Sequence, residues 1–269
     1  ECRAVRESCG LIEISNYGKF EITGPGATDW LSKIMACKVP AVGRIALSPM
    51  LNDAGRLICD FTLCRVSDER FFVVGTYAAE AFYLRWFEQH LPPTGVTVRP
   101  CAMEYLGLSV AGPQSRALLQ KLVDDDLSTT SFPFMSFAAM DVGMVPALVG
   151  RVSFTGEMGY EMWVTSEYLR ALYDLLHEAG KAHGLRNFGG RALNSLRLEK
   201  SFGIWTTEFR QQYTPRMTAM DRWIDWQKPD FVGRKAAMAD RDGSAPHFVQ
   251  ATIEIEAADA AASGYEPRW

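Results

Sequence analysis

Apolar and polar residues follow the same series of patterns twice along this chain. Residues 20–34 read as a short alternating strand, a Gly-Pro turn and a helix with an apolar face, and residues 108–122 read the same way. A β-hairpin and a second helix then follow in both halves. The hairpin strands and the helix are expected at residues 57–66, 71–75 and 78–91 in the first half, and at 147–154, 160–165 and from about Ser166 in the second. Each half therefore predicts the order β-α-β-β-α.

This repeated order predicts an α+β fold in which helices cover antiparallel sheets. A split βαβ arrangement of this kind is typical of ferredoxin-like units. Chance recurrence of a common supersecondary pattern is the alternative. After the second half we expect a helix, an aromatic loop, a short helix and a strand-like run, at residues 192–200, 202–215, 233–239 and 249–256. Because the chain starts without a methionine and stops just after that run, we expect a piece of a longer polypeptide.

Composition narrows the class of partner. A chain of 269 residues with 48% apolar residues can bury a large core. The net charge is −4 and the 28 basic residues are scattered, which argues against nucleic acid and a membrane surface as partners. No apolar run is long enough to span a bilayer, and the first ten residues are too charged for a signal peptide. We expect a cytoplasmic protein, or a mitochondrial matrix protein if it is eukaryotic.

The cysteines and histidines form no metal or disulfide pattern. All six cysteines lie in the first 101 residues without a CxxC pair, which predicts reduced and mostly buried thiols. The four histidines have no ligand spacing, so we expect no metal. The sequence also lacks GxGxxG after a strand, GxxxxGK[ST], GxSxG and HExxH, which argues against nucleotide-binding, serine-hydrolase and zincin classes.

Asp60 is the first candidate for chemistry. It lies within a strongly apolar strand, where alternation places Ile58 on the same side as Asp60 and Cys59 on the other. A carboxylate among such neighbours is desolvated unless it is paired or faces a cleft. The structural alternative is that Asp60 holds its own hairpin turn or pairs with an arginine.

Glu161 is the second candidate. The stretch from Arg151 to Glu161, RVSFTGEMGYE, predicts a strand, a tight glycine turn and a returning strand. A fixed carboxylate accepts two parallel N–H bonds, so it suits a guanidinium or the amino-pyrimidinone edge of a pterin. A cross-strand ion pair with Arg151 is the structural alternative. Glu157 lies at the turn itself and is expected to be solvated.

Aromatic residues follow the helix predicted at 192–200. They are Phe202, Trp205, Phe209 and Tyr213. Such side chains form either a wall on which a flat ring stacks or an ordinary satellite core. Within the helix, Arg197 is expected to make an internal ion pair.

Taken together, these motifs resemble the aminomethyltransferase family, the tetrahydrofolate-binding T-protein of glycine cleavage. The resemblance is closer still to the folate domain fused behind a flavin domain in dimethylglycine and sarcosine dehydrogenases. The motifs run in family order from about residue 4 to residue 236: VRESCGLIEISNYGKFEITGPGA, MLNDAGRLICDFT, VAGPQSRALL, FTGEMGYEMWV, ALNSLRLEK and MDRWIDWQKPDFVGRKA.

The family resemblance implies a cloverleaf of two ferredoxin-like domains and a C-terminal β-barrel around a central folate cleft. Residues 1–100 are then expected to form the first unit. Residues 101–240 are expected to form the second unit together with the cleft helix and the aromatic loop. Residues 241–269 would begin the barrel, near His247.

The resemblance also implies roles for particular residues. Asp60 matches the second acid of the family's GGxxDD pattern, which is held responsible for catalysis. Glu161 matches the carboxylate of YTGExGxE that grips the pterin ring. The other expected folate contacts are Phe154, Trp205, Gly75 and Leu47.

Three departures from the T-protein pattern are present. Cys59 replaces the first acid of the pair, Gly75 stands where T-proteins carry a folate-contacting asparagine, and Leu193 takes the place of an arginine in ALNSLR. ALNSLRLEK is the pattern of the dehydrogenase-fused branch. These changes therefore imply a donor other than the lipoyl-bound aminomethyl group.

The function implied is capture of a carbon from an N-methyl amine by tetrahydrofolate, giving 5,10-methylenetetrahydrofolate. The implied partners are a small-molecule one-carbon donor and a flavin dehydrogenase domain or subunit, with FAD on that partner and not on this chain. Two alternatives are a folate-dependent demethylase of a methylthio or methoxy donor, and a folate-binding protein without transferase activity. Relatives of this second kind, which act in iron-sulfur assembly, carry a KGCYxGQE segment. In this chain Lys200 is followed by SFGIWTTE, so the cysteine of that segment is missing.

Overall fold

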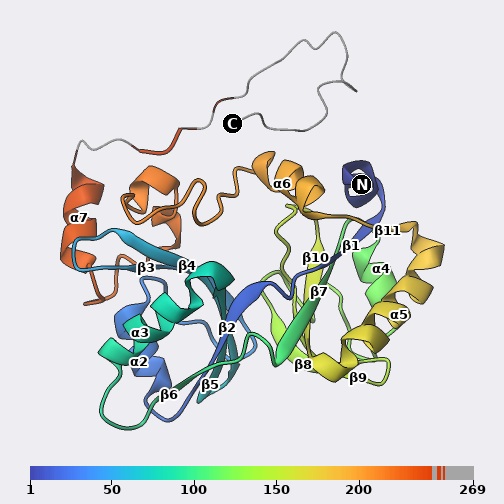
Figure 1. The fold of residues 1–269 in the computed structure, drawn as a ribbon, viewed down its shortest axis with the longest axis horizontal. Coiled ribbons are helices and arrows are strands. Elements are labelled where there is room, and N and C mark those ends of the chain that lie inside the picture. Colours follow the sequence, from blue (N-terminus) through green and yellow to red (C-terminus); the bar gives the residue numbers. More distant parts are fainter. Residues whose placement is uncertain (244–246, 250, 252–269) are drawn as a thin grey trace.

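The computed structural model describes residues 1–243, 247–249 and 251. Two sheets stand beside each other, with α2 and α3 on the outer side of the first and α4 and α5 on the outer side of the second (Figure 1). The bounds of these helices are Ala27–Ile34, Glu80–His90, Ser115–Leu119 and Leu169–Gly180. The α+β class and the two sheets predicted from the repeated pattern are confirmed.

The first sheet contains five strands in the order β3-β4-β5-β2-β6, all paired antiparallel. The strands are β2 Tyr17–Thr23, β3 Ile45–Leu51, β4 Leu57–Ser67, β5 Arg70–Thr76 and β6 Thr97–Pro100. Apolar residues at helical spacing turn one face of α2 and of α3 toward this sheet. Trp30 and Leu31 of α2 and Phe87 of α3 thereby pack with Phe20 and Phe61 of the strands.

The second sheet contains six strands in the order β11-β1-β7-β10-β9-β8. The strands are β1 Cys9–Glu13, β7 Tyr105–Ala111, β8 Phe137–Val142, β9 Val145–Gly150, β10 Gly159–Thr165 and β11 Leu185–Asn187. Leu118 of α4 and Leu172 of α5 lie in its outer core together with Val110 and Met162. Strand β11 is parallel to β1, and the other pairs are antiparallel.

Strand β1 belongs to the second sheet although it precedes the first sheet in the chain. It lies between β11 and β7. The preceding helix α1 (Cys2–Glu7) contributes Val5 to a core that also contains Leu196 of helix α6 (Gly190–Leu198). Residues 1–13 therefore pack with the second half, and the expected first unit over residues 1–100 does not describe them.

A third core joins the inner faces of the two sheets. It contains Cys64 and Phe72 from the first sheet and Phe137 and Trp163 from the second. The rings of Phe72 and Phe137 are stacked with their centroids 6.3 Å apart. Because side chains two positions apart share a strand face, this core fixes which residues of β4 and β10 point into the space between the sheets.

Most predicted elements of both halves are present, with three local differences. Strand β9 ends at Gly150 and β10 begins at Gly159, so residues 151–158 form a long loop instead of a tight turn. Ser166 opens a 3-10 turn (η2, Ser166–Tyr168), so α5 begins at Leu169, three residues after the expected start of the helix. The hairpin of β8 and β9, which turns at the left-handed Gly143, was not predicted.

The alternation predicted around Asp60 is interrupted by a bulge. Met50 pairs with Cys59 and Leu51 pairs with Leu57, which leaves Ile58 as the extra residue of β4. An extra residue shifts the side-chain alternation by one position. Ile58 accordingly packs in the same core as Cys59, contrary to the prediction.

The chain after α6 packs partly on the edge of the first sheet. Ile224 and Phe231 share a core with Leu51 and Leu57, next to α7 (Arg234–Asp242). Short 3-10 turns complete the element order: η1 Tyr77–Ala79, η3 Lys181–His183, η4 Arg216–Thr218 and η5 Asp221–Trp223. The predicted strand at 249–256 and the start of a barrel fall largely outside the described residues. None of the helices in the described part of the chain is long and apolar enough to cross a bilayer.

The six cysteines are unpaired, and five of them are buried. The prediction of reduced, mostly buried thiols is therefore confirmed. Burial raises the pKa of the Cys9 thiol to about 12, and the pKa values of Cys59 and Cys64 are also raised well above their usual range. Thiols in such surroundings are unreactive.

Candidate functional site

Asp60 lies in the middle of β4 and is half-buried, while its neighbours Cys59 and Phe61 are fully buried on the opposite face. Within residues 1–243 it has no ion-pair partner. The hairpin turn is held by Asn52 instead, whose side-chain oxygen accepts the backbone N–H groups of Ala54 and Arg56. Both structural alternatives for Asp60 are therefore wrong. Burial raises its pKa to about 7.

Glu161 occupies the corresponding kind of position in β10. It is half-buried and lies opposite Gly150 of β9 and Ser109 of β7. Burial raises its pKa to about 7 as well. The alternative of an ion pair with Arg151 is wrong, because that guanidinium donates to the carbonyl oxygen of Phe132 at 2.6 Å.

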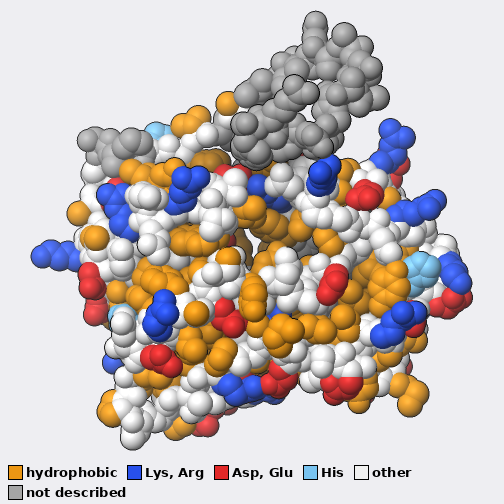
Figure 2. All heavy atoms as spheres, in the orientation of Figure 1, with side chains coloured by type: hydrophobic (Ala, Val, Ile, Leu, Met, Phe, Trp, Pro, Cys, Tyr) orange, Lys and Arg blue, Asp and Glu red, His pale blue; other side chains and the backbone are white. Residues whose placement is uncertain are grey.

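Tyr17 brings the two carboxylates into one site. The pKa of its hydroxyl is raised first by burial and then by the negative charges of Glu161 and of Asp60. Its ring stands edge-on to that of Trp163, at 6.4 Å between centroids, on the same strand face as Glu161. The Glu161 charge also raises the pKa of Cys64 on the first sheet. The two carboxylates thus face the same space, and the molecular face in Figure 2 is hollowed at its centre between the halves.

The sequence patterns did not single out Tyr17. It is the first residue of β2, opposite Thr76 of β5. The sequence feature that could have indicated Tyr17 is a polar aromatic residue at the start of a strand that follows a turn. Its proximity to both acids depends on how the sheets pack, which no local pattern encodes.

The expected folate contacts lie on several elements. Leu47 of β3 is partly buried against the core between the sheets. Phe154 lies in the 151–158 loop and stacks on Phe202 at 5.8 Å between centroids. Trp205, near the start of the aromatic loop, packs beside the core that contains Ile224.

A side chain at position 75 would lie on the face of the first sheet opposite to Asp60. A β-carbon added there would meet the ring of Phe61 at 2.6 Å and the sulfur of Cys59 at 3.4 Å. Both groups lie on the helix-covered face of the first sheet. A side chain at this position would therefore enter the outer core.

The four aromatic residues of the loop after α6 do not form one continuous wall. Phe202 pairs with Phe154, Phe209 is buried against Gly203, and Tyr213 is partly exposed. Arg197 makes the predicted internal ion pair, at 2.8 Å from Glu208, and its side chain is only 3% exposed. It also donates to the carbonyl oxygen of Phe202 at 3.0 Å.

Glu157 is not solvated as predicted. Its carboxylate lies 2.5 Å from Arg6 of α1. The same guanidinium reaches Glu199 at 2.6 Å. The loop before Glu161 is thus tied to the N-terminal helix, which comes from a part of the sequence about 150 residues earlier.

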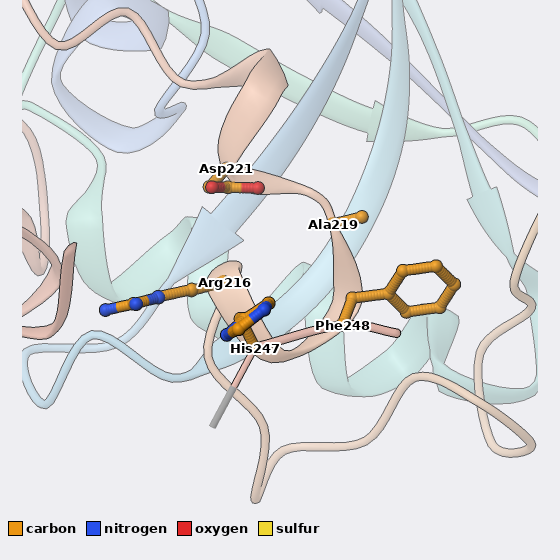
Figure 3. A pocket seen from close by; sticks show the side chains of 5 residues that line it. All are labelled: Arg216, Ala219, Asp221, His247 and Phe248. Atoms are coloured by element: carbon orange, nitrogen blue, oxygen red, sulfur yellow. The ribbon is translucent and has the colours of Figure 1, made fainter. Parts of the chain in front are cut away.

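A second hollow lies away from the carboxylates, beside η4 and η5. Figure 3 shows the side chains that line it: Arg216, Ala219, Asp221, His247 and Phe248. Arg216 donates there to the carbonyl oxygens of Asp240, Arg241 and Gly243, at distances of 3.0, 3.2 and 2.6 Å. Its charge therefore serves to close the C-terminal end of α7. Within the described ranges, the acids, cysteines and histidines form no group of three that would hold a metal ion.

The profile of the GCVT N-terminal domain family matches residues 1–228. This chain belongs to that family. The GCVT chain is 36% identical over 239 residues to "Dimethylglycine dehydrogenase, mitochondrial" of Rattus norvegicus, covering 88% of the chain and 28% of the relative. It is 29% identical over 240 residues to "Aminomethyltransferase" of Chloroherpeton thalassium, covering 88% of the chain and 66% of the relative.

A solved structure supports the fold of this GCVT chain. The glycine cleavage system aminomethyltransferase T from Bartonella henselae superposes with a TM-score of 0.80 at 23% identity, covering 90% of this chain and 66% of that one. The resemblance to the aminomethyltransferase family expected from the motifs is therefore confirmed. The GCVT chain spans less than a third of the rat relative.

Proposed function

We propose that this GCVT domain binds tetrahydrofolate between Asp60 and Glu161 and transfers a one-carbon unit to it. The observation that carries this proposal is the pair of half-buried carboxylates, one from each sheet, whose charges both raise the pKa of Tyr17. Relatives named as an aminomethyltransferase and a dimethylglycine dehydrogenase support the class of reaction. The proposed product is 5,10-methylenetetrahydrofolate, and the proposed donor of the carbon is an N-methyl amine.

The residues fit a pterin. A half-buried carboxylate without a charged partner is costly to ionise, as the raised pKa of Glu161 shows. Two adjacent N–H donors, such as those on the amino-pyrimidinone edge of a pterin, would stabilise the ionised form. The proposed role is supported by the two strand neighbours of Glu161, which are Gly150 without a side chain and the small Ser109.

Tetrahydrofolate supplies two nitrogen nucleophiles, N5 and N10, that take up a carbon at the formaldehyde oxidation level. Asp60 accepts the proton that a nitrogen loses on attack, since its pKa near 7 lets it exchange a proton at neutral pH. Glu161 holds the pterin ring so that the reacting nitrogens face Asp60. The two acids have similar pKa values, so position decides which one accepts the proton.

The remaining contacts are assigned as follows. Phe154, paired with Phe202, offers a flat apolar surface at the loop that leads to Glu161. Leu47 contributes apolar surface from the first sheet, and Trp205 lies on the aromatic loop. At Gly75 only the backbone is available, because the missing side chain faces the outer core.

A flavin dehydrogenase domain or subunit is the proposed source of the one-carbon unit, with FAD on that partner. The length of the dehydrogenase relative, of which this chain spans 28%, leaves room for such a domain. We further infer that each half is a ferredoxin-like unit, since β6-β2-β5-β4 in the first sheet follows a split βαβ order. A barrel beginning near His247 completes the proposed cloverleaf.

Calorimetric titration of the chain with 5-formyltetrahydrofolate tests the binding step. The control ligand is p-aminobenzoylglutamate, which lacks the pterin and cannot engage Glu161. Saturable heat with the folate and none with the control is the expected result. Equal binding of both ligands, or of neither, would contradict the proposed pterin site.

A further inference from the structure

Arg6 lies at the junction of three segments that are far apart in the sequence. It is on α1, and its guanidinium contacts both the 151–158 loop and the C-terminal end of α6. One terminal nitrogen donates to the carbonyl oxygen of Thr155 at 3.0 Å and to Glu157 at 2.5 Å. The other donates to the carbonyl oxygen of Leu196 at 3.2 Å and to Glu199 at 2.6 Å. The planar fork thus holds one segment on each nitrogen.

The contact of Arg6 with Glu157 is sheltered from solvent, whereas the Glu199 side chain is 55% exposed. The Arg6 side chain is 23% exposed and that of Glu157 is 24% exposed. Charged hydrogen bonds in partly buried positions contribute more than exposed surface pairs do. Arg3 on the same helix offers a contrast, since its side chain is 86% exposed and lies 3.9 Å from Glu7.

The two segments that Arg6 joins also contact each other. Gly156 has a φ of +75° and packs directly on Lys200, where an added β-carbon would meet the lysine stem at 2.3 Å. Phe154, two residues before Gly156, stacks on Phe202. The loop and the residues just after α6 therefore share one interface, and Arg6 lies at its base.

We infer that Arg6 is a positioning residue for folate binding, which acts by holding Phe154 against Phe202 in the loop that leads to Glu161. This inference rests on the proposed function. Arg6 contacts neither Asp60 nor Glu161 within the described residues, so it acts through the loop. The loop connects Gly150, the strand partner of Glu161, to Gly159 at the start of β10. Its conformation therefore acts on both strands that position Glu161.

Hydrogen exchange of the ligand-free chain tests the inference directly. In Arg6→Met, backbone amides of residues 152–158 are expected to exchange about tenfold faster, the scale of one lost charge-assisted hydrogen bond. Arg3→Met, on the same helix but outside the network, should leave these amides unchanged. Unchanged exchange in Arg6→Met would overturn the inference whether or not the chain binds folate.

A double-mutant cycle links the loop to the ligand. Affinity for 5-formyltetrahydrofolate is measured for the wild type, Arg6→Met, Phe154→Ala and the double variant. Arg6→Met should weaken binding about tenfold, and the double variant should bind about as weakly as Phe154→Ala alone. Losses that multiply would show that Arg6 does not act through Phe154. Arg6→Lys keeps the charge but not the fork, so it should recover only part of the affinity.

The two experiments distinguish failure of the proposed function from failure of the inference about Arg6. If the wild type binds no folate, the proposed function fails, whereas the exchange experiment still decides the role of Arg6. If thermal unfolding shows that Arg6→Met does not fold, Glu157→Gln replaces it in both experiments, because it removes the charged contact of Arg6 with the loop and leaves the contact with Glu199. Wild-type exchange rates and affinity in that variant would then overturn the inference.

Discussion

Asp60 of β4 and Glu161 of β10 lie on different sheets, and both of their charges act on the hydroxyl group of Tyr17. Each carboxylate is half-buried, and burial raises the pKa of each to about 7. A site with two such acids exchanges protons readily at neutral pH. It is complete only when the two sheets are packed together.

Asp60→Asn should abolish most of the transfer activity while leaving folate binding intact. Asparagine is nearly isosteric but cannot accept the proton, and loss of a general base lowers turnover by about 10²- to 10⁴-fold. The measurement is methylenetetrahydrofolate formation alongside calorimetric affinity. Full activity with unchanged affinity would remove Asp60 from the reaction.

Glu161→Gln should weaken binding of 5-formyltetrahydrofolate by about 1.5–3 kcal/mol, since a charged acceptor becomes neutral. Wild-type affinity should rise from pH 6 to pH 8, because the pKa of Glu161 is about 7 and its ionised form is the better acceptor. The variant should show no such rise. Glu178→Gln is the matched control, since that side chain is 74% exposed on α5. Parallel pH profiles for wild type and Glu161→Gln would count against the pterin clamp.

The raised pKa of Asp60 also predicts how stability depends on pH. The folded state holds this proton up to about pH 7, whereas the unfolded chain loses it near its ordinary value of 3.8. The contribution of Asp60 to stability therefore falls as pH rises from about 4 to about 7. Asp60→Asn should be about 1–3 kcal/mol more stable than wild type at pH 8 and nearly equal at pH 4.

Chemical denaturation at the two pH values measures this difference. Asp174→Asn provides the control, because that carboxylate is 55% exposed and pairs with an exposed arginine. Its effect should stay within about 0.5 kcal/mol at both pH values. A gain for Asp60→Asn that is the same at pH 4 and pH 8 would be inconsistent with a buried, raised-pKa acid.

Gly75→Ala should destabilise the chain by about 1–3 kcal/mol, because the added methyl group meets the buried Phe61 ring at 2.6 Å. Gly190→Ala is the control, since an added β-carbon there has nothing within 4 Å. Thermal unfolding of both variants gives the comparison. If Gly75→Ala is as stable as wild type, the Phe61 ring moves aside without cost and the predicted steric clash is wrong.

The two acids could be found from the sequence because each stands alone in an apolar strand. Alternation correctly separated Asp60 from Cys59 and Phe61, which is a local property of one strand. It misplaced Ile58, because the bulge depends on how β3 pairs with β4. The residue pattern of one strand does not show in which register the neighbouring strand pairs with it.

Features that depend on distant segments were missed for the same reason. Glu157 was expected to be solvated, but its partner Arg6 comes from the other end of the chain. Tyr17 became a site residue only through the packing of one sheet on the other. The family motifs identified some site residues that the periodicity of apolar residues does not reveal.

The position of β1 has a consequence for how the chain acquires its structure. All strands of the first sheet lie between Tyr17 and Pro100, so that sheet can close early during synthesis. Strand β1 is made before them, and its partners β7 and β11 begin only at Tyr105 and Leu185, after the first sheet. Such long-range pairing is slow to form. Strand β1 therefore has no partner until the first sheet has been made, and the carboxylate site is complete only after β10 has emerged.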